Sequence, residues 1–198
     1  MQKIADITED EVIALFLKTE INSDRFKKYI LDILVRDGRN REIMDSPDTS
    51  NKEDNKYRAA VLGETRGYGQ NKWLFNGFPS DVKWLRAQLT KEELKKAKLI
   101  KYDSKSTNSR KPEEVAEKIR QDEEVPGQNR ELILKAVQAM NDGVQFPEMI
   151  LVTKNNTSEL VVLEGHLRMI AYQLSKKFPD SIEVILGLSP ELDNWAFY

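Results

Sequence analysis

Five consecutive residues, Glu164-Gly165-His166-Leu167-Arg168, form the part of the sequence best equipped to do chemistry. They stand between a short apolar run at 160–163, typical of a strand, and a segment whose apolar residues recur at helical spacing. A helix N-terminus presents unpaired N–H groups and about half a positive charge, so it attracts anions. Glycine allows a sharp turn and the close approach of a ligand. We therefore predict a phosphate-binding turn made by Gly165, His166, Leu167 and Arg168.

Arg168 strengthens this prediction because a cation in the first turn of a helix opposes the helix dipole. The cost is about 0.3–1 kcal/mol unless an anion occupies the site. A planar guanidinium suits phosphate, and a helical side chain leans toward the N-terminus. The alternative is that Arg168 makes an ordinary surface ion pair.

His166 and Glu164 flank the predicted turn and are the candidate catalytic residues. An imidazole can donate to a phosphate oxygen or exchange a proton near neutral pH. Glu164 could orient His166, bind Mg²⁺ or accept a proton. The simpler alternatives are that His166 caps or packs at the helix start and that Glu164 is a capping carboxylate.

The composition excludes several other chemistries. The 198 residues include no cysteine and one histidine, which rules out thiolate catalysis, disulfides, Cys-ligated metals and multi-histidine zinc sites. With 31 Lys and Arg against 33 Asp and Glu, the net charge of −2 gives no general attraction to duplex DNA. We expect no membrane partner, because no apolar run approaches the ~18 residues of a span. Without a signal peptide, a cytoplasmic location is expected.

The first 77 residues are predicted to be helical. Thr8 and Glu11 have the spacing of a capping box at the start of a helix. The polar stretch 45–56 contains Pro47 and is expected to be a loop before a helix at 55–66.

Residues 78–198 mix the patterns of strands and helices, so we predict an α+β protein. Thr90 and Glu93 form a second capping-box pattern, and the basic stretch from Lys91 to Lys101 is expected to be a solvated helix face. Strands are expected at 99–102 and 182–186, with a loop at 103–111 between the first of them and a helix that begins at Pro112. Another helix is expected at 129–141. The apolar runs 149–153 and 160–163 predict a hairpin whose turn spans 154–158.

The 164–168 motif resembles the signature of the ParB/sulfiredoxin superfamily, which places an acidic or Gly residue, Gly, two variable residues and Arg at the start of a helix. Ala171 matches the Ala-containing helix face of that signature. The run 146–152 is similar to the strand that precedes it in the family, and Arg110 stands where ParB-type proteins often have an Arg before their first helix. The resemblance covers roughly residues 98–188. Together with the helical pattern of residues 1–77, it implies a helical N-terminal region followed by a ParB/sulfiredoxin-like mixed-sheet domain at 78–198.

The resemblance implies binding of nucleotide phosphates, with Arg110 joining the motif. Sulfiredoxins use a motif cysteine where this chain has His166, so their reaction is excluded. ParB proteins have two Arg residues in their motif. This chain keeps one, Arg168, and has Leu167 at the other position. The acidic-Gly-His-X-Arg motif of the superfamily's free-serine kinases, which bind ADP phosphates, is the most similar. The expected ligand is ATP, ADP or CTP with Mg²⁺, and the expected reaction, if there is one, is phosphoryl transfer or nucleotide hydrolysis.

Two other functions remain open at this point. One is a ParB-like DNA-associated or nuclease-type protein, and the other is a non-enzymatic interaction module in which the motif only caps a helix. The sequence leaves the oligomeric state and the acceptor open.

Overall fold

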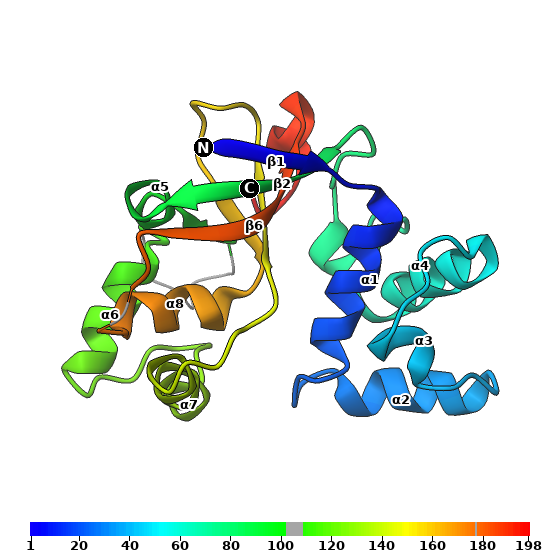
Figure 1. Ribbon diagram of the computed structural model, residues 1–198, viewed down its shortest axis with the longest axis horizontal. Helices are drawn as coiled ribbons and strands as arrows, with labels where there is room; N and C mark the ends of the chain where they lie inside the picture. Colours follow the sequence, from blue (N-terminus) through cyan, green and yellow to red (C-terminus); the bar gives the residue numbers. More distant parts are fainter. Residues whose placement is uncertain (102–108, 177) are drawn as a thin grey trace. The chain divides into compact units, whose positions relative to one another are not determined.

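The protein is described here by a computed structural model that covers residues 1–101, 109–176 and 178–198 (Figure 1). The chain forms two compact units. The sheet unit comprises Met1–Asp6, Asp81–Asp193 and Phe197–Tyr198, and the helical unit comprises Ile7–Ser80 and Asn194–Ala196.

The sheet unit is built on a six-stranded mixed sheet in the order β1-β2-β6-β4-β5-β3. Three neighbouring pairs are antiparallel, β1 with β2, β2 with β6 and β4 with β5, whereas β6 with β4 and β5 with β3 are parallel. The strands are β1 (Gln2–Asp6), β2 (Lys83–Thr90), β3 (Lys98–Leu99), β4 (Met149–Thr153), β5 (Val161–Glu164) and β6 (Ser181–Leu188).

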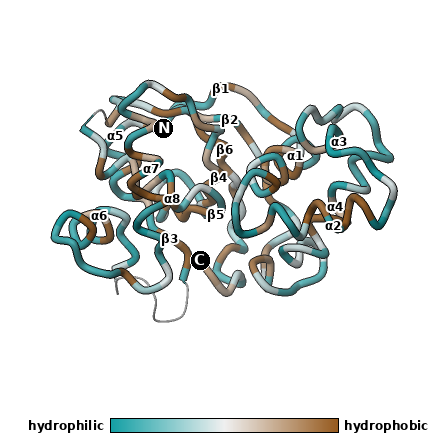
Figure 2. Tube along the Cα trace, turned by 90° about the horizontal axis from the view of Figure 1, so that it is seen from below, coloured by the Kyte–Doolittle hydropathy of each residue, from teal (hydrophilic) through white to brown (hydrophobic). Residues whose placement is uncertain are grey.

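The centre of the sheet is apolar on both faces, which is typical of strands covered on both sides. All five residues of β4 are buried. The α-helices in the described part of this unit are α5 (Lys91–Lys95), α6 (Pro112–Arg120), α7 (Arg130–Asn141) and α8 (His166–Leu174). Helices α6, α7 and α8 lie together on one side of the strands (Figure 1), and brown segments gather where the central strands lie (Figure 2). The central strands and α8 therefore form one core, which includes Leu151, Val162, Met169 and Leu186.

The helical unit contains α1 (Glu9–Glu20), α2 (Lys27–Arg36), α3 (Glu42–Asp45) and α4 (Lys52–Arg66), followed by the short 3-10 helix η1 (Trp73–Phe75). Its most buried cation is Arg58, which is fully buried in α4. The Arg58 guanidinium donates to the main-chain oxygens of Ile43 at 3.2 Å and Asp48 at 2.9 Å. Through these bonds α4 holds the chain between α3 and its own N-terminus.

The α+β class is confirmed, and so are both capping boxes, at Thr8 with Glu11 and at Thr90 with Glu93. The antiparallel hairpin of β4 and β5 is also as expected. Four features differ from the sequence-based expectation. Residues 2–6 form an edge strand of the sheet and not part of a helix. The short helix α3 extends to Asp45, where a loop was expected to begin. Helix α4 begins at Lys52 and not at 55, because Asn51 caps it. The strand predicted at 99–102 is the shorter β3, and the loop predicted at 103–111 lies largely outside the described residues, as does Tyr102.

Within the part of the chain that the structure describes, no helix has the length and apolar character needed to cross a membrane.

The packing of β4 predicts the cost of a core cavity. Leu151 is fully buried in the middle of the sheet, so Leu151→Ala is expected to lower the free energy of unfolding by about 2–5 kcal/mol. The measurement is urea unfolding followed by circular dichroism. Val144→Ala is the control, because Val144 is 54% exposed in the same unit and its truncation is expected to change stability by less than about 0.5 kcal/mol. Equal effects of the two substitutions would contradict this assignment of the core.

Candidate functional site

The 164–168 motif forms a turn from a strand into a helix. Strand β5 ends at Glu164, and α8 begins at His166. Gly165 between them has a φ of +101°, in the left-handed region that favours glycine. A Cβ at Gly165 would also lie 2.7 Å from Cγ of Met149. The turn therefore needs glycine both for its backbone conformation and for its contact with β4.

Arg168 points into the protein and is bonded to three groups. Its side chain is only 7% exposed. Nη2 donates to a carboxylate oxygen of Glu164, and Nη1 donates to the main-chain oxygens of Pro147 and of Glu148, the latter at 3.2 Å. We call this set of bonds the Arg168 clasp. The anion that offsets a cation beside the helix dipole is thus the chain's own Glu164.

The side chains of the two central motif residues face different surroundings. His166 is half-buried at the first position of α8. Leu167 packs against the apolar cluster that includes Leu99, Val115 and Ile170. Leu167 can therefore approach a ligand only with its main-chain N–H group.

Arg110 stands apart from the motif and is held at the edge of the sheet next to β3. Its main-chain oxygen accepts from the N–H of Leu99 at 2.8 Å, and its Nε donates to the oxygen of Leu99 at 2.7 Å. Its Nη1 donates to the main-chain oxygen of Tyr198 at 3.0 Å. The backbone of Arg110 has a φ of +61°, which is uncommon for a residue with a side chain. Burial lowers the pKa of its guanidinium, so the environment compensates this charge incompletely.

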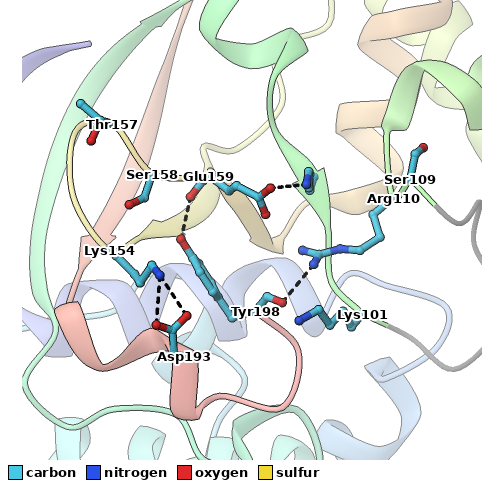
Figure 3. Close-up of a pocket in the computed structure, with 10 residues that line it drawn as sticks. Lys101, Ser109, Arg110, Lys154, Thr157, Ser158, Glu159, Asp193 and Tyr198 are labelled. Atoms are coloured by element: carbon cyan, nitrogen blue, oxygen red, sulfur yellow. Dashed lines mark hydrogen bonds and ion pairs between the residues drawn. The ribbon is translucent and has the colours of Figure 1, made fainter.

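Arg110 lines a cavity of about 630 Å³, and the 164–168 motif does not (Figure 3). The cavity also takes residues from β3, from the turn between β4 and β5 and from the C-terminal segment. Its described lining consists of Lys98, Lys101, Ser109, Arg110, Lys154, Thr157, Ser158, Glu159, Asp193 and Tyr198.

Two ion pairs and an aromatic ring form the cavity wall. Lys98 bonds the carboxylate of Glu159 and thereby lowers the pKa of that carboxyl. Nζ of Lys154 lies 3.0 Å from each carboxylate oxygen of Asp193 and 5.7 Å from the centre of the Tyr198 ring. The Tyr198 hydroxyl in turn donates to the main-chain oxygen of Glu159 at 3.0 Å (Figure 3).

The structure thus separates residues that the sequence analysis grouped, and it brings others together. Arg110 was expected beside Arg168, yet it lines the cavity. Lys98 and Lys101 were expected on a solvated helix face, but Lys98 is in β3 and both line the cavity. Lys154, Glu159 and Asp193 were not singled out, because nothing in their sequence spacing signals that they meet.

Among the described residues, no three His, Asp or Glu side chains gather to bind a metal ion. The Glu164 carboxylate is bonded to Arg168, which does not fit its expected role as a Mg²⁺ ligand.

Comparison with family models, with curated proteins and with solved structures finds no match for this chain.

The Arg168 clasp predicts a strong dependence of stability on this arginine. Arg168→Ala leaves the Glu164 carboxylate, whose side chain is 15% exposed, without its cation, so the free energy of unfolding is expected to fall by about 3–5 kcal/mol. Urea unfolding of single and double variants measures this effect.

Removing the charge of the partner provides the matched comparison. In a Glu164→Gln background, Arg168→Ala is expected to cost clearly less, with a coupling of about 1–3 kcal/mol between the two positions. Additive effects, or a loss below about 1 kcal/mol for Arg168→Ala alone, would show that the clasp contributes little.

Proposed function

We propose that this chain binds a nucleotide through its phosphate groups at the start of α8. The observation that supports the proposal is the way this helix begins. It follows directly after a left-handed glycine, which has no side-chain oxygen to accept from the first N–H groups of the helix. Such main-chain donors, together with the helix dipole, favour a phosphate.

The contacts of Arg168 suggest a role different from the one the sequence analysis gave it. Because its guanidinium is bonded to Glu164 and to two main-chain oxygens, Arg168 is a positioning residue in this proposal. The clasp fixes the turn at Gly165 against the chain before β4. In this proposal the N–H groups of His166 and Leu167 would be the phosphate ligands.

His166 is the side chain best placed to assist these donors. Helical side chains lean toward the N-terminus, so an imidazole at the first position of α8 lies close to a phosphate bound there. Of the two candidate catalytic residues, Glu164 is held by Arg168, which leaves His166 to exchange a proton in phosphoryl transfer or nucleotide hydrolysis.

The ligand class comes from the resemblance to the ParB/sulfiredoxin superfamily, which favours ATP, ADP or CTP. A Mg²⁺ ion that accompanies the nucleotide would be bound by the phosphates, since Glu164 is already paired. The net charge of −2 gives no electrostatic support to an extension of the proposal to DNA.

Thermal unfolding with and without nucleotide tests the proposal. ATP, ADP or CTP at millimolar concentration with Mg²⁺ is expected to raise the melting temperature by about 2 °C or more, because a ligand that binds only the folded state stabilises it. His166→Ala is expected to reduce this shift by more than half while leaving the melting temperature of the free protein nearly unchanged.

Lys176→Ala is the matched control, since it removes an exposed side chain just beyond the other end of the same helix. It is expected to leave the nucleotide shift intact. The proposal fails if none of the three nucleotides shifts the melting temperature, or if the His166→Ala and wild-type proteins respond equally.

A further inference from the structure

We infer that the cavity around Arg110 is a separate anion-binding site, suited to a ligand with two or more adjacent phosphate groups. The inference is independent of the function proposed for the start of α8. The cavity is lined by Ser158 and Glu159, which precede β5, whereas the 164–168 motif begins at the last residue of β5. The two sites therefore lie at opposite ends of this strand.

The charge of the cavity is the first support. Among the described lining residues, four cationic side chains face two carboxylates, although the whole chain carries a net charge of −2. Lys98 and Lys154 are each paired with one of these carboxylates, those of Glu159 and Asp193. The charges of Lys101 and Arg110 are left in excess, and two neighbouring cations match a ligand with more than one negative group.

The second support is an unused hydrogen-bond donor. Among the residues that the structure describes, the buried Nη2 of Arg110 has no hydrogen-bond partner. A buried donor without an acceptor costs about 1–3 kcal/mol, so such groups need an explanation. Nε and Nη1 are fixed by Leu99 and Tyr198, which holds the guanidinium in place for an acceptor at the remaining nitrogen.

The third support is the chemistry of the surrounding wall. Ser158 brings a hydroxyl group from the turn between β4 and β5, whereas the hydroxyl of Thr157 already donates to the side-chain oxygen of Asn155 at 2.8 Å (Figure 3). This turn is organised by the Asn155 side chain, whose oxygen accepts from the N–H groups of Thr157 at 2.9 Å and Ser158 at 3.0 Å. A volume of about 630 Å³ lies within the range of small-molecule sites, roughly 300–1,000 Å³.

The existing ion pairs do not prevent anion binding. The Asp193 side chain is 69% exposed and the Glu159 side chain 50% exposed, so both carboxylates already interact with water. Exposed ion pairs of this kind contribute about 0–1 kcal/mol to stability. A charge-assisted hydrogen bond to a polyphosphate is stronger than that. Lys98 and Lys154 can therefore turn from their carboxylates toward a phosphate.

Isothermal titration calorimetry with inorganic tripolyphosphate tests this inference, because the probe has adjacent phosphates and no nucleoside. We expect binding that weakens as salt is raised. The side chain of Lys101 makes no hydrogen bond to the described residues. Lys101→Glu reverses its charge and is expected to weaken tripolyphosphate binding roughly tenfold or more. Arg110→Lys keeps the charge but loses the planar fork, and a smaller loss of affinity is expected.

Two further variants distinguish the cavity from the rest of the protein. Lys96→Glu makes the same change of charge at an exposed position that does not line the cavity, and affinity is expected to stay within about twofold. His166→Ala is expected to weaken tripolyphosphate binding less than Lys101→Glu does, because His166 does not line the cavity. The inference is overturned if tripolyphosphate does not bind, if Lys101→Glu has no effect, or if Lys96→Glu weakens binding equally. It is also overturned if binding is lost in His166→Ala and kept in Lys101→Glu, a result that would instead place the anion at α8.

Discussion

The Arg168 clasp is the interaction on which the strand-to-helix turn depends. One guanidinium joins the last residue of β5, the first turn of α8 and the chain that leads into β4. Because the group is nearly buried, its charge requires the carboxylate of Glu164 beside it. Gly165 fits between them only as glycine, so the motif has a structural explanation in addition to any ligand it binds.

This arrangement changes how the motif is interpreted. An Arg in the first turn of a helix suggests a missing anion when only the sequence is considered, and the fold supplies that anion from within the chain. In the proposed function, a ligand would bind to the main-chain N–H groups at the start of α8, with His166 beside them. Among the described residues that line the cavity, the two cations without an ion pair to a carboxylate are Lys101 and Arg110, beside the short strand β3.

Local patterns predicted much of the fold, and long-range contacts explain what they missed. Capping boxes and the hairpin depend on residues a few positions apart, so Thr8 and Thr90 begin helices as expected. Strand β1 is exposed at all five residues and has no apolar alternation that would signal a strand, so it is recognised only by its pairing with β2 about 80 residues later. The oxygens that hold Arg168 and the approach of Lys154 to Asp193 are likewise set by the tertiary fold.

The single histidine makes the central claim directly measurable. In an NMR titration the imidazole C–H signals come from His166 alone, so no assignment among several histidines is needed. If a nucleotide binds at the start of α8, adding ATP, ADP or CTP with Mg²⁺ will move these signals progressively until they saturate, together with the amide signals of Gly165 and Leu167. Imidazole and amide signals that stay fixed at millimolar concentrations of all three nucleotides would contradict the proposed site.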